Sequence, residues 1–410
     1  MHVGIEALNV YCGIAQIPVA TLFEARGLDS ARLDNLMMME RAVALPFEDP
    51  ITNAVNAALP ILEQMSEEEK NAIAVLIIGS ESGIDYSKSI SSYVHAHLGL
   101  SRNCRIMEVK QACFASTAAV QMAVGYLASG VAPGAKVLII GTDVALVDQR
   151  AEYMEPTVGH GAAAILLAED GQIARFDLGA FGNYSFETMD SARPTSTFEI
   201  ADVDGSLFTY LDCFSNSYAD YTSKVDGVSF TDTFNYLAMH TPFSGLVKAG
   251  HRKMMREHSG WRPEQIVDDF SRRVSPSLKY PSRVGNLCSA SVYLALASTI
   301  DHAPVQGCAR VGMFSYGSGC SSEFFSVTID ESSHDALAKM DIKGRLDQRY
   351  LLSFAEYQQI LTENLRCLQA VEHRKIDTAG LEKFHVGRPS GQRMLALDGI
   401  ENYHRKYRWI

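Results

Sequence analysis

Cys113 has the chemistry and the position expected of an acyl-carrying nucleophile. It stands in EVKQACFAST, directly before an apolar segment typical of a helix. A helix N-terminus lowers the pKa of a thiol and stabilises the thiolate, and the same N–H groups can bind a thioester oxyanion. The alternative is a buried structural cysteine, the commoner role for this residue type.

Glu81 and His240 could complete an acid–base pair around such a nucleophile. Glu81 lies in SESG, directly after the apolar run AVLIIG, so it follows a predicted strand at the sheet edge where ligands bind. A carboxylate in an apolar pocket gains basicity and could remove a proton from a thioester methyl group. His240, in LAMHTPFSG, could donate a proton to a developing alkoxide or bind an acyl carbonyl. A helix-start charge and a structural histidine are the competing interpretations.

Two further residues could orient a carbonyl group without titrating. Asn286, in GNLCSASVY, offers an amide donor. Ser315, in FSYGSG, follows a predicted strand among glycines that would let backbone amides approach an acyl oxygen.

The elements that must position these residues alternate between strands and helices. Strand-like runs at 74–79, 136–141, 163–168 and 310–314 are separated by helical segments, which predicts βαβ units and a largely parallel, buried sheet. One unit occurs twice. Cys113 precedes a helix and a strand beginning at Val137, and Asn286 precedes a helix and a strand beginning at Val311, at nearly equal spacing. The repeat predicts a duplicated fold whose two junctions meet at the centre.

We expect two similar halves, residues 1–170 with Glu81 and Cys113 and residues 171–410 with His240 and Asn286. The segment 180–235 is aromatic, polar and irregular, and is predicted to be an insertion that covers a substrate cleft. Residues 330–380 are predicted to be helical and peripheral, and the tail NYHRKYRWI to form a strand or arm.

Composition excludes several classes of protein. The net charge of -12 argues against nucleic-acid binding. Eight scattered cysteines without metal-ligand spacing argue against a zinc site or a disulfide framework. No apolar stretch is long enough to span a membrane and the N-terminus does not resemble a signal peptide, so a cytoplasmic protein is expected.

Together, SESG, EVKQACFAST, HTPF, GNLCSASVY and FSYGSG resemble, in this order, the hydroxymethylglutaryl-CoA synthase family of the thiolase superfamily. The resemblance covers nearly the whole chain. It implies an α/β, duplicated thiolase-type fold with five αβαβα layers, and a reaction without cofactor or metal. It also implies roles for six residues: Cys113 as the acetylated nucleophile, Glu81 as general acid/base, His240 as acceptor-binding histidine, and Thr117, Asn286 and Ser315 as contacts of the acyl thioester.

Within the family, SESGIDYSKS and EVKQAC are most similar to synthases of bacterial polyketide pathways that install β-branches. This implies that acetyl passes from an acyl carrier protein to Cys113. Glu81 then generates the carbon nucleophile that attacks the β-keto group of a second carrier-bound chain, and water releases the product. The expected partners are carrier proteins bearing phosphopantetheine, with CoA thioesters as the alternative, in a homodimer.

The sequence departs from the mevalonate-pathway members of the family at two places. At the nucleophile, Phe114 and Ala115 replace tyrosine and glycine, and after the histidine Gly245 stands where many relatives have lysine. Lys248 is then the first basic residue available to bind substrate. The basic residues that follow Lys248 are a candidate carrier-protein patch or, alternatively, a solvated helix face: His251, Arg252, Lys253 and Arg256.

Four other functions fit parts of the pattern. A mevalonate-pathway synthase would use acetyl-CoA and acetoacetyl-CoA. A ketoacyl synthase of the acetyl-priming type also uses Cys, His and Asn, but it generates its carbanion by decarboxylation and needs no Glu81. A Cys/His hydrolase with Asn286 orienting His240 leaves the repeat unexplained, and an inert carrier-docking subunit leaves the intact Glu81, Cys113 and His240 unexplained.

Overall fold

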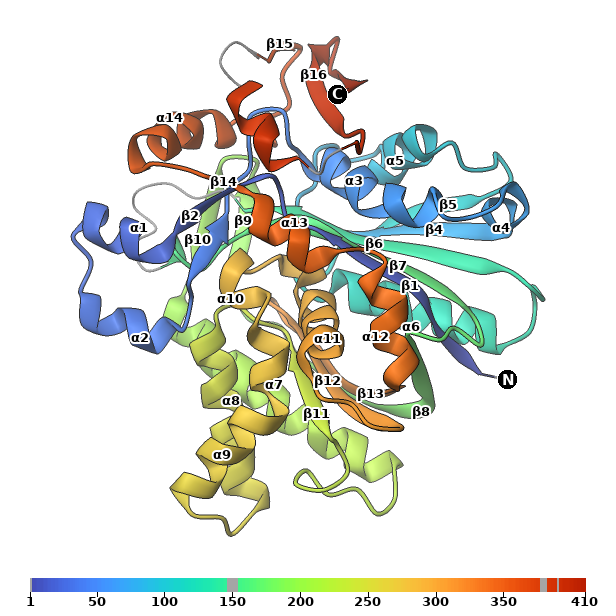
Figure 1. Cartoon of the computed structure of the whole chain (residues 1–410), viewed down its shortest axis with the longest axis vertical. Coiled ribbons are helices and arrows are strands. Elements are labelled where there is room, and N and C mark those ends of the chain that lie inside the picture. The colour runs from blue at the N-terminus through green and yellow to red at the C-terminus, as the bar shows by residue number, and fades with distance from the viewer. Residues whose placement is uncertain (1, 146–153, 377–381, 389–390) are drawn as a thin grey trace.

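The computed structural model describes residues 2–145, 154–376, 382–388 and 391–410. Its centre is one sheet of nine strands (Figure 1). In spatial order the strands are β11 (Tyr236–Met239), β12 (Ala309–Gly317), β13 (Ser321–Ile329), β8 (Ala174–Ser185), β1 (Val3–Tyr11), β7 (His160–Glu169), β6 (Lys136–Val144), β4 (Ile73–Gly79) and β5 (Arg105–Val109).

The sheet consists of two parts with the same topology. In the first, β4 is parallel to β6, while β6 and β7, and β7 and β1, are antiparallel. In the second, β11 is parallel to β12, while β12 and β13, and β13 and β8, are antiparallel. Only a short antiparallel pairing between β1 and β8 joins the two parts. The predicted duplication is confirmed.

The predicted largely parallel sheet is wrong. Only β4 with β5, β4 with β6, and β11 with β12 are parallel pairs within it. The physical reason is that, after a helical crossover to a parallel strand, the chain does not cross over again but returns along an antiparallel strand. From β12 to β13 the chain turns back directly, so the next strand must run in the opposite direction.

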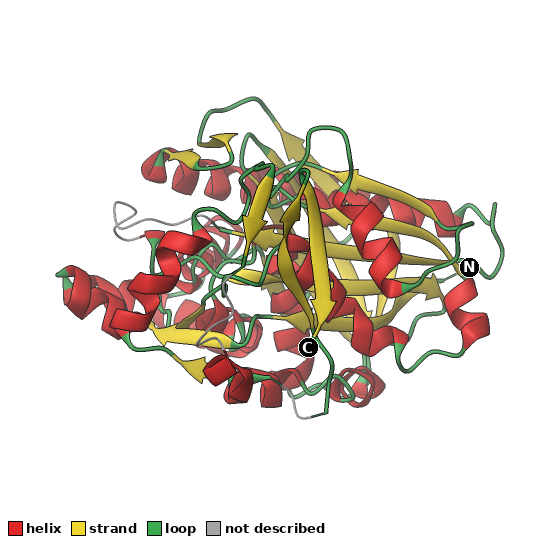
Figure 2. Cartoon of the chain, turned by 90° about the horizontal axis from the view of Figure 1, so that it is seen from above, coloured by secondary structure: helices red, strands yellow, loops and turns green. Residues whose placement is uncertain are grey.

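Helices pack against both parts of the sheet (Figure 2). Helices α3 (Pro50–Leu62) and α5 (Ile90–Leu98) pack on the outer face of the first part. Helices α6 (Ala115–Ala128) and α11 (Ser291–His302) form the middle layer, and α7 (Val203–Lys224) covers the outer face of the second part. This is the five-layered αβαβα arrangement that was predicted.

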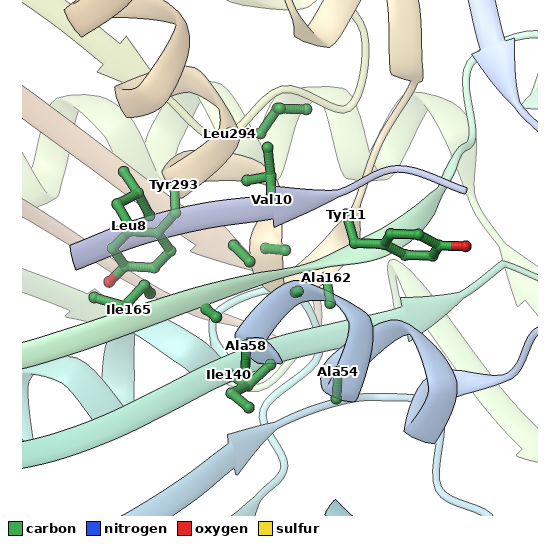
Figure 3. Close-up of a cluster of buried hydrophobic side chains, with 14 of the residues drawn as sticks. Leu8, Val10, Tyr11, Ala54, Ala58, Ile140, Ala162, Ile165, Tyr293 and Leu294 are labelled. Atoms are coloured by element: carbon green, nitrogen blue, oxygen red, sulfur yellow. The ribbon is translucent and has the colours of Figure 1, made fainter. Parts of the chain in front are cut away.

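The core follows from strands that are buried on both faces. The apolar runs of β4, β6 and β7 are almost wholly buried, as expected for strands with helices on either side. Figure 3 shows Leu8 and Val10 of β1 on the same side as Tyr293 and Leu294 of α11, with Ala58 of α3 on the other side of the sheet. The sheet that carries the candidate residues is therefore held rigidly between helices.

The segment 180–235 contains more regular structure than its sequence indicated. After the end of β8 it forms a hairpin of β9 (Ser191–Thr195) and β10 (Phe198–Ala201), and then the 22-residue helix α7. Helix α8 (Ser244–His258) and α9 (Pro263–Arg273) follow in sequence, and α7 and α9 both pack against α8 (Figure 1).

The remaining elements are short or peripheral. The described part of the predicted helical segment 330–380, up to residue 376, contains three helices and two short strands, and the tail forms a terminal strand, as predicted. In chain order these elements are β2 (Ala15–Pro18), α1 (Val19–Arg26), α2 (Leu33–Leu36), β3 (Glu40–Ala42), α4 (Glu67–Asn71), α10 (Pro281–Val284), α12 (Glu331–Ala338), α13 (Ile342–Gln348), β14 (Tyr350–Leu351), α14 (Phe354–Asn364), β15 (His373–Lys375), β16 (Leu395–Glu401) and β17 (His404–Trp409). None of the described helices is long and apolar enough to cross a membrane.

Candidate active site

A cleft of about 720 Å³ brings together four of the predicted residues, Glu81, Cys113, His240 and Asn286. Both parts of the sheet contribute to it, and the hairpin β9–β10 and the first turns of α7 and α8 supply further walls. Apolar and aromatic side chains on these walls include Phe198, Val203, Leu207, Tyr210, Phe243 and Leu246. A mainly apolar cleft with a few converging polar groups is the expected form of a small-molecule site.

The duplication explains why these four residues meet. Glu81 follows β4, and His240 follows β11, the equivalent strand of the second part. Cys113 precedes α6, and Asn286 precedes α11, the equivalent helix. Each part therefore delivers one residue from a strand end and one from a helix start, and all four face the boundary between the halves.

Cys113 and Glu81 are in direct contact. The Sγ of Cys113 lies 3.4 Å from Oε2 of Glu81 and donates a hydrogen bond to it. Ala112 has a φ of 44°, in the left-handed region that non-glycine residues rarely adopt, so the backbone turns sharply just before the nucleophile. Gly317 of β12 lies against this turn, where an added Cβ would meet the backbone N of Phe114 at 2.5 Å.

The expectation of a lowered thiol pKa is wrong. A hydrogen bond with Cys288 lowers the pKa of Cys113, but burial and the negative charges of Glu81 and Asp143 outweigh it and raise the pKa to about 12. The carboxylates would repel an ionised sulfur, and this repulsion outweighs the stabilisation of a thiolate by the helix N-terminus. Cys113 is therefore a protonated thiol that requires a base before it can attack.

Glu81 has the properties of that base. Burial and the neighbouring charge of Asp143 raise its pKa to about 7, against the opposing charge of Arg193. Its backbone N–H donates to Oδ1 of Asp143 at 2.9 Å. The other oxygen of Asp143 accepts the N–H of Ser289, in the loop that holds Asn286. One buried carboxylate thus ties the Glu81 loop to the Asn286 loop.

The hairpin β9–β10 contributes Arg193, which contacts Glu81 on the side away from Cys113. Its Nη2 lies 3.5 Å from Oε1 of Glu81 and 3.1 Å from Oε2 of Glu199, and its Nη1 donates to the backbone oxygen of Glu81 at 3.3 Å. Oε1 of Glu81 therefore faces the arginine, while Oε2 faces the thiol.

His240 is buried and neutral. Burial lowers the pKa of His240 to about 3, so the ring carries no charge at physiological pH. Its backbone is held on both sides, because His240 N donates to Phe314 O at 2.7 Å and the Tyr210 hydroxyl donates to His240 O at 2.9 Å. A neutral imidazole suits hydrogen bonding to an acyl carbonyl better than donation of a full proton.

Asn286 is fixed by its backbone and by its own side chain. Its N–H donates to Thr157 O at 2.8 Å, and its Oδ1 accepts the N–H of Cys288 at 2.9 Å. Since the oxygen is engaged, the amide nitrogen is left to donate into the cleft, as a carbonyl-orienting role requires.

The other predicted contacts of the acyl group do not line the cleft. Thr117 is buried in α6 and accepts a hydrogen bond from the hydroxyl of Tyr293 at 3.3 Å. Ser315 is buried inside β12 instead of after it, because this strand extends to Gly317. Lys248 is exposed on α8, with its Nζ 5.8 Å from the centre of the Phe270 ring. Direct contact of these three residues with a thioester remains a prediction.

The candidate carrier-protein patch divides into exposed and buried members. Arg252 and Arg256 are exposed on α8, and Lys253 is partly buried and pairs with Glu257 at 2.8 Å. His251 does not belong to this surface, because it is buried and hydrogen-bonds Asp269 at 2.8 Å.

Sequence reasoning missed three residues of the site. Asp143 ends a buried strand, the same signal that indicated Glu81. Cys288 lies two residues after Asn286 but is one of eight scattered cysteines. Arg193 comes from an irregular segment in which no pattern distinguishes it. Only Glu81, Cys113 and Cys288, among the residues that the structure describes, are grouped closely enough to hold a metal ion.

Two family models match this chain. The model of the hydroxymethylglutaryl-coenzyme A synthase N terminal family matches residues 1–172, and the model of the corresponding C terminal family matches residues 263–383. The 3-hydroxy-3-methylglutaryl-ACP synthase PksG of polyketide biosynthesis in Bacillus subtilis is 44% identical, with 99% of each chain covered. The hydroxymethylglutaryl-CoA synthase of Enterococcus faecalis is 31% identical, over 89% of this chain and 93% of the relative.

Among solved structures of the family, the curacin synthase is likewise more similar to this chain than MvaS is. The curacin pathway HMG synthase in complex with holo donor-ACP superimposes with a TM-score of 0.97 at 44% identity, with both chains fully covered. MvaS in complex with 3-hydroxy-3-methylglutaryl coenzyme A gives a TM-score of 0.86 at 28% identity, with 99% of each chain covered. These matches confirm the predicted thiolase-type fold.

Proposed function

The chain belongs to the hydroxymethylglutaryl-CoA synthase family, and from this membership and the site we infer the reaction that it catalyses. It is an acyltransferase that forms a carbon–carbon bond between an acetyl group, delivered by an acyl carrier protein, and the β-keto group of a carrier-bound polyketide intermediate. The contact between the Cys113 thiol and the Glu81 carboxylate, in a cleft shared with His240 and Asn286, carries this proposal. The likeness to PksG and to the curacin synthase supports the carrier-dependent branch.

The first step is the transfer of acetyl to Cys113. The thiol holds its proton, since its pKa is about 12, and Glu81 accepts that proton along the existing hydrogen bond. The sulfur then attacks the carbonyl carbon of the acetyl thioester. The phosphopantetheine thiolate leaves and takes up the proton, which restores the Glu81 carboxylate.

In the second step, Glu81 removes a proton from the methyl group of acetyl-Cys113. A carboxylate with a pKa of about 7 is a stronger base than an ordinary glutamate and is still half ionised near neutral pH. The resulting carbanion attacks the β-keto carbon of the acceptor. Neutral His240 donates a hydrogen bond to the acceptor oxygen, Asn286 orients the acyl carbonyl, and the proton held by Glu81 can pass to the new alkoxide.

Hydrolysis completes the cycle. Water attacks the thioester that links the product to Cys113, with Glu81 again the nearest base, and the thiol is restored. Because hydrolysis of a thioester is strongly favourable, it pulls the condensation forward.

The basic surface of α8 is our candidate for contact with an acidic carrier protein. The first turn of α8 lines the cleft at Phe243 and Leu246, and Arg252 lies about 12 Å along the helix from its first residue, at the usual rise per residue. Arg252 and Arg256 are four residues apart, so both lie on one face and are available to bind carboxylates. A cytoplasmic location also remains a prediction.

The decisive experiment is intact-protein mass spectrometry after brief exposure to acetyl-carrier protein or, separately, to acetyl-CoA. We expect a Cys113-dependent acetyl adduct from the carrier protein that is absent in Cys113→Ala. Cys308→Ser, which changes an exposed cysteine instead, serves as the matched control. Equal labelling from acetyl-CoA would favour the mevalonate-pathway reaction, and no adduct from either donor would contradict the mechanism.

A further inference from the structure

Three potential metal ligands converge inside the cleft. Glu81, Cys113 and Cys288 all line it, and one carboxylate oxygen and two sulfurs lie within 4.8 Å of one another. Cys288 has no part in the reaction proposed above. The sulfur of the nucleophile therefore stands beside a second thiol and a carboxylate, in a space that opens to solvent.

The orientation of each group favours a shared ligand. Arg193 engages Oε1 of Glu81, which leaves Oε2 directed at the Cys113 sulfur. Cys288 has a φ of 49°, and its N–H is held by Oδ1 of Asn286, so its position is fixed by its backbone. The three ligand atoms thus come from three separate segments of the chain that the fold holds in place, and Cys288 begins a short 3-10 helix.

The charges around the two sulfurs favour a cation between them. Glu81 points a carboxylate oxygen at the Cys113 sulfur, and the carboxylate of Asp143 accepts the backbone N–H of Glu81. A divalent ion bound by two thiolates and a carboxylate would offset the negative charge gathered here.

Ligand chemistry selects the class of ion. Thiolates prefer soft cations, and Zn²⁺ bonds of about 2.3 Å to sulfur would place two bound sulfurs about 3.8 Å apart in tetrahedral geometry. The observed grouping, within 4.8 Å, requires only small side-chain movements to reach it. A hard cation such as Mg²⁺ would find a single carboxylate oxygen and no suitable set of partners.

We propose that Glu81, Cys113 and Cys288 bind one thiophilic divalent cation, such as Zn²⁺, and that the bound ion blocks acetylation of Cys113. Binding releases one proton from each thiol to solvent and leaves both sulfurs in the same oxidation state. The fourth position, facing the cleft, is taken by water. The inhibition rests on the proposed function, because it assumes that Cys113 is the acylated residue, whereas the binding itself does not.

Co²⁺ titration of the full chain, after treatment with a chelator, tests the binding without any acyl donor. We expect one Co²⁺ per chain, thiolate-to-cobalt charge-transfer absorption, displacement by Zn²⁺ and no effect of excess Mg²⁺. Cys288→Ser should weaken binding at least about tenfold, since even changes around a ligand have that effect. Cys308→Ser, at an exposed cysteine, should leave binding unchanged. No such absorption in the unaltered chain, or the same affinity in Cys288→Ser, would overturn the site.

A second measurement needs no variant. Zn²⁺ should protect Cys113 and Cys288, but not the exposed Cys308, from alkylation by iodoacetamide, as read by peptide mass spectrometry. Equal alkylation with and without Zn²⁺, at an alkaline pH and reagent concentration that modify both cysteines of the metal-free chain, would contradict the proposal. If the metal binds but acetyl-carrier protein never labels Cys113 in its absence, the proposed function fails and the metal site stands. If acetylation proceeds with the ion bound, the inhibitory role is wrong.

Discussion

The negative charges next to Cys113 determine how this nucleophile can be activated. With a pKa of about 12 the thiol cannot ionise by itself at physiological pH, and its one hydrogen-bonded acceptor is Glu81. The cysteine and the glutamate therefore act as a pair in which the carboxylate controls the reactivity of the sulfur. This coupling suits Glu81, which serves as the base in each step of the proposed cycle.

The pair predicts that acetylation of Cys113 depends on the ionisation of Glu81. Because the pKa of Glu81 is about 7, roughly a tenth of the carboxylates are ionised at about pH 6 and roughly nine tenths at about pH 8. The initial rate of acetylation, measured by quenched-flow mass spectrometry, should rise with pH across this range and then level off. Glu81→Gln should remove this dependence and slow the reaction by about 10²–10⁴-fold.

A suitable control is Glu68→Gln, which changes an exposed glutamate on α4. It should reproduce the pH profile of the unaltered chain. A rate that is constant from about pH 6 to about pH 8, or a Glu81→Gln variant with the original profile, would show that another group accepts the proton.

At the scale of elements, the hairpin β9–β10 adds a positively charged side chain, Arg193, to a site whose other residues are positioned by the sheet and its helices. Arg193 is the one cation on this hairpin within the described structure, and it contacts both the side chain and the backbone of Glu81. Its positive charge lowers the pKa of Glu81, whereas burial and Asp143 raise it. The hairpin therefore both orients the base and limits the rise in its pKa.

Replacing Arg193 should shift the pH profile. In Arg193→Gln the positive charge is lost, so the pKa of Glu81 rises further above 7 and the rate of acetylation reaches its plateau at a more alkaline pH. At neutral pH the rate should fall, and Arg193→Lys should restore part of it. Arg102→Gln, at an exposed arginine, is the control. A lower rate with an unshifted profile would mean that Arg193 only supports the local structure.

The middle layer depends on a close approach of β6 to both central helices. A Cβ on Gly141 would lie 2.3 Å from the Oγ of Ser116 in α6 and 3.2 Å from the Cα of Ala290, the residue before α11. Both neighbours are buried, and neither can move far without shifting a helix start that carries Cys113 or Asn286. The glycine is thus a packing requirement of the site itself.

Gly141→Ala should therefore lower the free energy of unfolding by about 1–3 kcal/mol, the usual cost of overpacking. The measurement is a denaturant unfolding curve. Gly125→Ala, on the exposed side of α6, is the matched control, because an added Cβ there meets nothing within 4 Å apart from the backbone of its own helix, and alanine favours a helix by about 0.5–1 kcal/mol. Equal effects of the two substitutions would contradict the proposed packing.

At the scale of the whole molecule, the parts that could be predicted are those that repeat. The strand–helix units around Cys113 and Asn286 share a pattern because each half buries its strands and helix in the same way. Glu81 and His240 follow equivalent strands, so the duplication that was visible in sequence also predicts that these residues converge.

What could not be predicted depends on tertiary contacts. Arg193 reaches Glu81 from a hairpin whose sequence has no regular alternation. The pKa of Cys113 is set by Glu81 and Asp143, which lie far from it in sequence, so the position before a helix was a misleading guide. Strand direction depended on how the strands pair, with β7 antiparallel to β6 and β13 antiparallel to β12, and the apolar runs of these strands do not specify direction.

The surface beside Cys113 bears on the assembly of the molecule. Strand β5, which leads into the nucleophile loop, lies at one edge of the nine-stranded sheet and pairs on one side only within the described structure. Helix α6 contacts β5, and Met107 of β5, Met122 of α6 and Val131 after α6 are exposed apolar residues. A strand edge combined with such residues is typical of an interface between copies of a chain.

This surface supports the predicted homodimer, in which two β5 edges would pair about a two-fold axis. Light scattering should give the mass of two 45.0 kDa chains. Met122→Asp, which buries a charge against the partner if α6 lies in the interface, should shift the equilibrium toward the monomer. Val267→Asp, at an exposed valine on α9, should leave the dimer intact. If the unaltered chain is a monomer, the prediction is wrong. A dimer unaffected by Met122→Asp would place the interface elsewhere, away from the loop that carries Cys113.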